Sequence, residues 1–276
     1  MIVIIRKFVE LIVFGNIWIS LGASALTLNT FLIMEWTINP SLILLVFFAT
    51  ILSYSLQRIL RHTGGNEINS IRHQWVYKQI NLLFVLIVIS SCLSGYLFFK
   101  IFSFYELLYF SPLIVIALFY AVKLFRKSLR DIPFLKIILI ASSWAAVTVL
   151  IPAYINQELS AYSTWAIFTL NFIYIFALVI PFDIRDLQVD EPEKKTIPQL
   201  IGWKASKYTG ITLLIICGLL SYTFFKEAIY SIPIYFFSIL LMLQVNDKRK
   251  ELFYAFGIDG LILLFPFSTW IIKSYI

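Results

Sequence analysis

Charge is scarce in this sequence, and no long polar stretch interrupts it. Charged residues make up 13% of the 276 residues, whereas 61% are hydrophobic and the mean hydropathy is +0.89. A typical soluble domain is about 25% charged and about 45–50% apolar. This deficit excludes an ordinary soluble protein and indicates one that lies in lipid. Because no polar segment is long enough to form a second domain, we predict a single transmembrane helical domain over residues 1–276.

Cysteine and histidine are also rare, with two of each. Cys92 and Cys217 fall inside apolar segments and form no CxxC pair, so we expect buried thiols and neither a disulfide framework nor a redox motif. His62 and His73 form no convincing metal pair, and we expect both beside lipid headgroups. The net charge of +7 comes from basic loops, and since no soluble basic module accompanies them, nucleic acid is not an expected partner.

Long apolar segments account for most of the chain. A spanning helix needs about 20 apolar residues, and most of these segments reach that length. They must be helices, because lipid offers the backbone no hydrogen-bond partners. We therefore predict an all-α integral membrane protein with nine transmembrane helices. The predicted spans are residues 9–34, 40–56, 80–99, 105–122, 134–152, 162–182, 208–225, 230–245 and 252–272.

Positive charge lies almost entirely on one side of the predicted membrane. When the nine segments alternate across the bilayer, all 22 lysines and arginines except Lys100, Lys226 and Lys273 fall on the same side. The positive-inside rule places that side in the cytoplasm. We therefore expect an integral protein of a bacterial plasma membrane, with a cytoplasmic N-terminus and an external C-terminus. Contact with anionic membrane lipid is the other expected role of the basic loops.

The sequence PFDIRDLQVDEPEKKTIP, residues 181–198, concentrates acids directly after an apolar segment. Spacings of three and four predict that Asp183, Asp186 and Asp190 share one face of a continuing helix. Grouped carboxylates repel each other unless a cation or water lies among them, and oxygen ligands suit Mg²⁺ that is shared with phosphate. The alternative is a solvated acidic loop balanced by neighbouring bases. The position at the end of an apolar helix favours a site for a lipid with a diphosphate head.

Residues 183–202, DIRDLQVDEPEKKTIPQLIG, resemble the second aspartate-rich motif of the UbiA superfamily of intramembrane prenyltransferases. FYAVKLFRKSLRDIPFLK, residues 119–136, resembles the loop after the fourth helix of that family, which carries Tyr and Lys. GIDGLILLFPF, residues 257–267, resembles its last span. The resemblance implies nine helices around one central cavity that opens to the cytoplasm.

The resemblance also implies a reaction. An isoprenyl diphosphate binds with its tail in the bundle, Mg²⁺ neutralises the leaving diphosphate, and a lipid-soluble acceptor, often aromatic, attacks the carbocation. The implied catalytic residues and metal ligands are Asp183, Asp186 and Asp190. The residues expected to contact the diphosphate are Tyr120, Lys123, Arg126 and Lys194. The bases after the fourth segment have an alternative role as positive-inside charge.

The first aspartate motif of the family, NDxxDxxxD, is replaced here. The matching stretch is YSLQRILRH, residues 54–62, in which Ser55, Arg58 and His62 occupy the three Asp positions. Arg58 and Arg61 place guanidinium groups where metal ligands are expected. Since arginine binds phosphate in a bidentate manner without a metal, both are candidate diphosphate ligands.

Three functions are consistent with these residues. The first is a prenyltransferase with one Mg²⁺ site at Asp183, Asp186 and Asp190. The second is a non-catalytic relative that binds a prenyl lipid or a membrane partner. A transporter is disfavoured, because only Glu10 and Asp259 approach the interior of a span and both lie near its end. The acceptor, which could be a quinone precursor, the prenyl chain length and the oligomeric state are left open.

Overall fold

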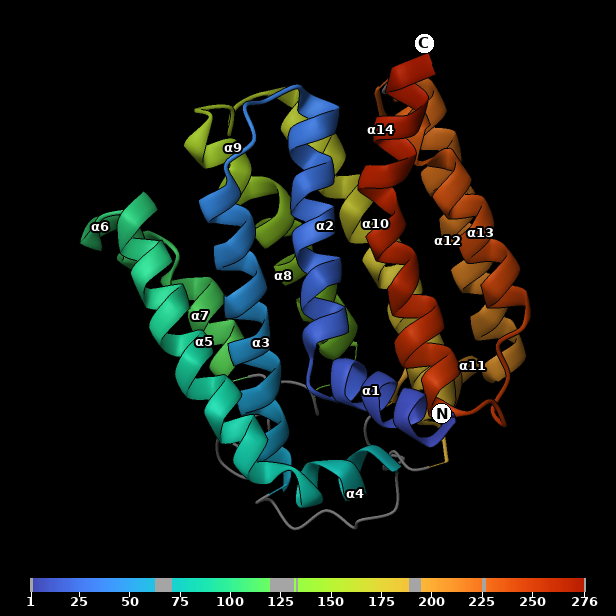
Figure 1. The fold of residues 1–276 in the computed structure, drawn as a ribbon. Helices are drawn as coiled ribbons and strands as arrows, with labels where there is room; N and C mark the ends of the chain where they lie inside the picture. Colours follow the sequence, from blue (N-terminus) through green and yellow to red (C-terminus); the bar gives the residue numbers. More distant parts are fainter. Residues whose placement is uncertain are drawn as a thin grey trace. The chain divides into compact units, whose positions relative to one another are not determined.

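The computed structural model describes residues 2–62, 71–119, 132, 134–188, 195–224 and 227–275. Within these ranges, residues 2–6, 61, 62, 118, 119, 224 and 227 are described by their backbone only. Every regular element in the described ranges is a helix (Figure 1). The prediction of an all-α protein is therefore confirmed for this part of the chain.

Seven helices are long and apolar enough to cross a membrane, which supports the prediction of an integral membrane protein. They are Ile17–Met34, Pro40–Leu60, Ile80–Ile101, Leu135–Ile155, Tyr162–Arg185, Trp203–Thr223 and Phe253–Tyr275. The predicted span 230–245 is represented by the shorter apolar helix Ala228–Leu243. The predicted span 105–122 extends beyond the described residues. Nine helices around a central cavity accordingly remain a prediction.

The chain divides into two compact units. Unit 1 contains Met1–Ser24 and Asn39–Arg130, and unit 2 contains Ala25–Ile38 and Asp131–Ile276. Each unit has apolar helices of spanning length. The prediction of one domain over the whole chain stays a prediction.

Unit 1 is built around α3 and α5, which pack against each other along their length. Ile59, Val76 and Leu83 form its small buried cluster. The Nε2 atom of Gln57 donates to the carbonyl of Ala117 at 3.2 Å and ties α3 to α7. The helices of this unit are α1 (Ile2–Phe14), the first part of α2 (Ile17–Met34), α3 (Pro40–His62), α4 (Ile71–Lys78), α5 (Ile80–Ile101), α6 (Phe104–Tyr109) and α7 (Ser111–Phe119).

The first predicted span, 9–34, is wrong in its boundaries, because the helix is interrupted after α1. Asn16 adopts a left-handed backbone conformation with φ of 65° and separates α1 from α2. A left-handed residue ends a helix, since the next turn cannot continue the ladder of hydrogen bonds. The spanning helix begins at Ile17. Hydropathy alone could not show this break, because the apolar run continues through it.

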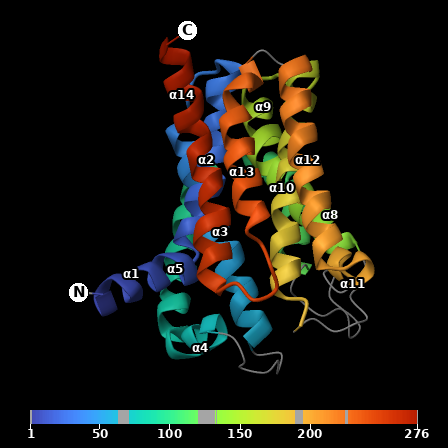
Figure 2. The same cartoon turned by 90° about the vertical axis from the view of Figure 1, so that its right-hand side faces the viewer.

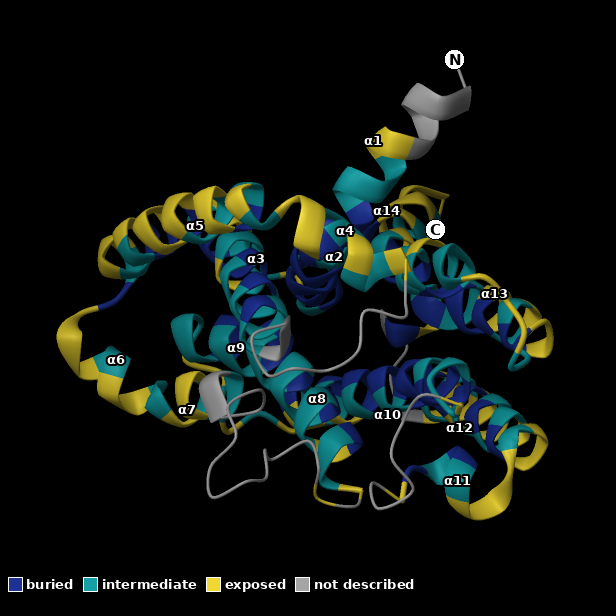
Figure 3. Ribbon diagram, turned by 90° about the horizontal axis from the view of Figure 1, so that it is seen from below, coloured by how far each residue is buried: buried dark blue, intermediate teal, exposed yellow. Residues whose placement is uncertain are grey.

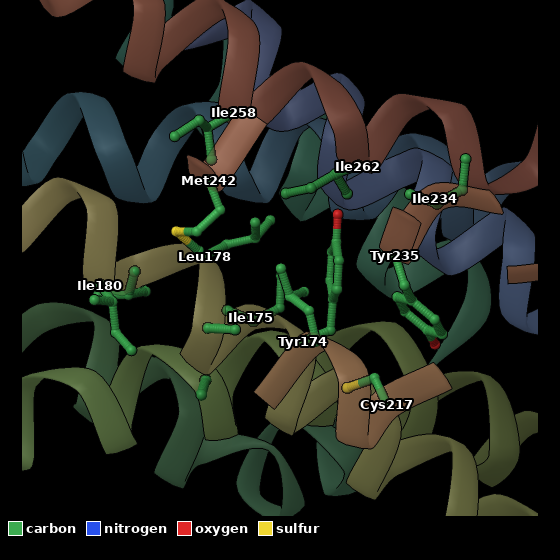
Figure 4. Packing of buried hydrophobic residues seen from close by; sticks show 14 of the residues in the cluster. Tyr174, Ile175, Leu178, Ile180, Cys217, Ile234, Tyr235, Met242, Ile258 and Ile262 are labelled. Carbon is green, nitrogen blue, oxygen red and sulfur yellow. The ribbon is translucent and has the colours of Figure 1, made fainter. Parts of the chain in front are cut away.

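Unit 2 is built around α10, whose buried side chains form the centre of its core. Tyr174 lies in the middle (Figure 4), with ring centroids 4.9 Å from Phe265 and 5.7 Å from Tyr235. Its hydroxyl group is 3.1 Å from Oγ of Ser238. The elements are the second part of α2, α8 (Leu135–Ala145), η2 (Ala146–Leu150), α9 (Ile151–Ile155), α10 (Tyr162–Arg185), α11 (Ile197–Ile201), α12 (Trp203–Phe224), η4 (Glu227–Ser231), α13 (Ile232–Leu243), η5 (Phe253–Ile258), η6 (Leu261–Leu264) and α14 (Phe265–Tyr275).

The two cysteines differ in exposure, which corrects half of the prediction. Cys217 is buried against α10, as expected, whereas Cys92 on α5 is exposed. Figure 3 shows many exposed positions along α5 and many buried positions along α10. A thiol is apolar enough to face lipid, so its place within an apolar segment does not determine whether it is buried.

The described bases of unit 2 lie mostly at one end. The start of α8 meets the end of α10 through Lys136 and Asp183. The start of α12 meets the end of α13, where Nζ of Lys207 donates to the carbonyl of Leu243 at 3.3 Å (Figure 2). The bases of this end are Lys136, Arg185, Lys195, Lys204, Lys207, Lys248, Arg249 and Lys250. Lys273 lies at the other end and pairs with Glu35 at 2.9 Å.

Candidate functional site

The candidate site lies where α10 ends. The helix stops at Arg185, and Asp186 occupies its C-terminal cap position. The prediction that Asp183, Asp186 and Asp190 lie along one face of a continuing helix is therefore wrong, because the helix ends as the apolar run gives way to charged residues. Asp190 lies outside the described residues.

Asp183 is buried inside unit 2, with 2% of its surface exposed. A buried carboxylate is costly unless a cation or several donors compensate it. Lys136 supplies that cation from the first turn of α8, where its Nζ atom donates to Oδ1 of Asp183. The side chain of the lysine is 16% exposed, so the pair lies just inside the polar end of the unit.

Asp186 is held by its neighbour Arg185. The Nε atom of Arg185 donates to Oδ1 of Asp186 at 2.7 Å, and Nη2 donates to Oδ2 at 2.8 Å. This is the bidentate geometry in which arginine binds carboxylates most strongly. Both oxygens of the carboxylate therefore accept a hydrogen bond from one guanidinium group.

Two aromatic rings lie close to the same guanidinium group. Its central carbon lies 5.1 Å from the ring centroid of Phe182 and 5.9 Å from that of Tyr254. These distances are in the range of cation–π attraction. Tyr254 comes from η5, a π-helical stretch, and its hydroxyl group donates to the carbonyl of Asn246 at 2.5 Å. Stretches of π-helix are rare and frequently occur at functional sites.

One donor of this cluster has no acceptor in the part of the chain that the structure describes. The Nη1 atom of Arg185 is buried and has no hydrogen-bond partner among the described residues. Glu251 and Asp259 both interact with Arg185 electrostatically. The charge of the guanidinium group is thus held first by Asp186, which accepts the hydrogen bonds from its Nε and Nη2 atoms.

The described residues do not fit a Mg²⁺ site in this arrangement. Carboxylates are suitable ligands, but Asp183 already holds Lys136, and both oxygens of Asp186 already hold Arg185. Among the described residues, no group of three or more His, Cys, Asp or Glu could hold a metal ion. Mg²⁺ at the second motif is therefore still a prediction, since its third ligand, Asp190, is not described.

Of the other predicted site residues, one is described with its side chain, one by its backbone only, and four lie outside the described residues. Arg58 belongs to unit 1, where its Nη1 atom donates to the carbonyl of Phe14 at the end of α1. Arg61 is described by its backbone only. Since Arg58 and Asp183 belong to different units, their presence at one site stays a prediction. Tyr120, Lys123, Arg126 and Lys194 lie outside the described residues.

Sequence reasoning missed Lys136 and Tyr254 as members of the cluster. The positive-inside rule assigns Lys136 only the role of a loop charge that sets the topology. A sharper signal existed, because this base lies inside the predicted apolar segment 134–152 and must find a compensating acid there. Nothing in the sequence around Tyr254 indicates that its ring would lie beside Arg185.

Comparison with known proteins adds no family to this picture. No family model, curated protein or solved structure matches the chain. The likeness to the UbiA superfamily therefore rests on the residues of its motifs alone.

Proposed function

We propose that this protein is a UbiA-like membrane prenyltransferase. It binds an isoprenyl diphosphate with the prenyl tail among the apolar helices and the diphosphate at the basic end of unit 2, and it transfers the prenyl group to a lipid-soluble acceptor. The observation that carries the proposal is the cluster of Asp183, Asp186, Lys136 and Arg185 at the end of the apolar helix α10. A polar cluster directly beneath an apolar span matches a ligand with a charged head and an apolar tail.

The chemistry suits this arrangement. The bond between the allylic carbon and the diphosphate oxygen breaks, and the electron pair leaves with the diphosphate. The acceptor then attacks the carbocation and releases a proton. Apolar helices keep water from the cation, and the basic end of the unit attracts the anionic diphosphate. In this proposal the basic end faces the cytoplasm of a bacterium, as the positive-inside rule requires.

No step of this scheme passes through Mg²⁺, because Lys136 and Arg185 hold the carboxylates of Asp183 and Asp186. A metal could bind there only by displacing one of these cations, or together with Asp190. The requirement for a metal is therefore an outcome of the experiment below.

A second function is favoured by a specific observation. Asp183 and Asp186 are already neutralised inside the protein, and Arg58 donates to the carbonyl of Phe14. These contacts are those of a structural framework. A non-catalytic UbiA-like protein that binds a prenyl lipid or a membrane partner would retain them without cleaving a diphosphate.

The test uses the purified full chain in lipid nanodiscs with radiolabelled farnesyl and geranylgeranyl diphosphate, in Mg²⁺ and in EDTA. Bound label and released diphosphate are measured, with an extract of bacterial membrane lipids as the source of acceptors. Transfer of label into the extract supports the proposal. Tight binding of intact diphosphate without release supports the non-catalytic function. Absence of both binding and release refutes the prenyl-ligand proposals.

A matched pair of variants locates the reaction. Asp186→Asn removes the carboxylate that holds the guanidinium group of Arg185, so we expect transfer to fall at least about tenfold, since a hydrogen bond between charged groups is worth about 1.5–3 kcal/mol. Glu35→Gln removes a carboxylate from the exposed ion pair with Lys273 at the other end of unit 2. We expect this control to leave transfer unchanged. Equal activity of both variants would place the reaction elsewhere in the chain.

A further inference from the structure

The first helix, α1, has one polar and one apolar side. At 100° per residue, Lys7 and Glu10 lie on one side of the helix, whereas Phe8 and Ile12 lie on the opposite side. Phe8 is 61% exposed, and Lys7 is exposed beside it. A large apolar side chain on the apolar face of a helix therefore has little protein cover.

The bend after α1 is specifically stabilised. Asn16, which is fully buried and left-handed, donates from Nδ2 to Oγ of Ser55 at 2.9 Å. Arg58 donates to the carbonyl of Phe14, one of the groups that a helix end leaves without an intrahelical partner. A Cβ atom at Gly15 would lie 2.4 Å from the carbonyl oxygen of Leu11, so the close turn depends on glycine.

These contacts determine the direction of α1 within unit 1. The rings of Phe14 and Trp75 lie 5.9 Å apart, and α4 packs beside α1. In Figures 1 and 2, α1 runs across the direction of α3 and of the first part of α2, and not along it. A helix that crosses the direction of the spans and joins one of them through two residues lies at the membrane boundary.

We propose that α1 is an in-plane helix that binds the membrane surface. Its apolar side, which includes Phe8, enters the boundary between headgroups and acyl chains, and Lys7 binds anionic lipid headgroups. An amphipathic helix with basic residues near its polar side is the form that binds such surfaces. The occupant is lipid, because the link to α2 holds α1 at the bilayer and the exposed Lys7 complements anionic headgroups. The inference is independent of the proposed prenyl transfer.

Spin-label EPR tests the position of α1. A nitroxide is attached to Phe8→Cys or Lys7→Cys in the Cys92→Ser and Cys217→Ala background, and the protein is reconstituted into vesicles of phosphatidylcholine with phosphatidylglycerol. Collision with oxygen and with a water-soluble nickel complex gives the depth of each label. The reference is a separate sample in which Cys92 is kept and labelled. Because Cys92 is exposed near the middle of α5, its label marks the hydrocarbon centre and also reports correct folding.

The expected result is that the difference between collision with oxygen and collision with nickel changes sign between the labels at Lys7 and Phe8. The label at Phe8 should collide more often with oxygen than with nickel, but lie shallower than the label at Cys92, whereas the label at Lys7 should collide mainly with nickel. Replacing phosphatidylglycerol by phosphatidylcholine should move the Phe8 label toward water, and Lys7→Gln should reduce that shift.

Three outcomes would overturn the proposal. Nickel access at both positions would place α1 in water. Depths equal to that of Cys92 at both positions would make α1 part of a span. Low access to both reagents at both positions would show that protein covers the helix.

Discussion

Removing the lysine of the buried ion pair should destabilise unit 2 strongly. In Lys136→Met, the carboxylate of Asp183 stays in a site that is 2% exposed but loses its cation. Breaking a buried pair in this way costs about 3–5 kcal/mol. Because the lysine side chain is 16% exposed and water reaches its end, we expect a value near the lower limit, about 3 kcal/mol. A unit of about 150–250 residues loses about 2–4 °C per kcal/mol, which predicts a fall in Tm of about 6–12 °C.

The double variant isolates the pair. Lys136→Met with Asp183→Asn removes both charges, and a neutral pair of similar size is often as stable as the ion pair. We therefore expect the double variant to recover most of the lost stability. Lys204→Met is the matched control, because Lys204 is exposed at the same end of the unit. A surface change of this kind should cost no more than about 0.5 kcal/mol.

The thiol of Cys217 allows the thermal unfolding of unit 2 to be measured. Its thiol is buried in the core of unit 2, so in a Cys92→Ser background a thiol-reactive fluorogenic dye reports unfolding of this unit as the detergent-solubilised protein is heated. A Tm of Lys136→Met equal to that of Lys204→Met would refute the buried pair. Failure of the double variant to recover would show that the lysine acts through another contact. Recovery of Lys136→Met on addition of Mg²⁺ would support the predicted metal site.

Three further variants test separate features. Arg58→Met should destabilise unit 1 by about 1.5–3 kcal/mol through loss of the charged hydrogen bond to Phe14, and unchanged diphosphate binding in the nanodisc assay would make its role structural. Gly15→Ala should cost about 1–3 kcal/mol because its Cβ atom would overlap the preceding turn; a circular dichroism melt that matches wild type would contradict this. Tyr174→Phe should cost about 0.5–1.5 kcal/mol through loss of the bond to Ser238, measurable by the Cys217 dye, and a larger loss would indicate disturbed packing.

Local composition was sufficient to predict several of the apolar helices of spanning length. The predicted spans 162–182 and 252–272 correspond closely to the helices Tyr162–Arg185 and Phe253–Tyr275. A window of apolar residues determines such helices by itself, because lipid forces the backbone to form its own hydrogen bonds. Residues 183 and 186 could likewise be recognised as candidates from the acids that follow an apolar run. Their partners could not be recognised in the same way.

Tertiary structure decided what those residues contact. Lys136 and Asp183 are 47 positions apart, and no local pattern shows which base would neutralise a buried acid. The bend at Asn16 likewise depends on Ser55, which is 39 positions away. A left-handed residue in an apolar run is costly unless contacts from other helices compensate it. Since hydropathy does not show such contacts, the predicted first span runs through Asn16 without a bend. Hydropathy depends on neighbours in sequence, whereas ion pairs and bends depend on neighbours in space.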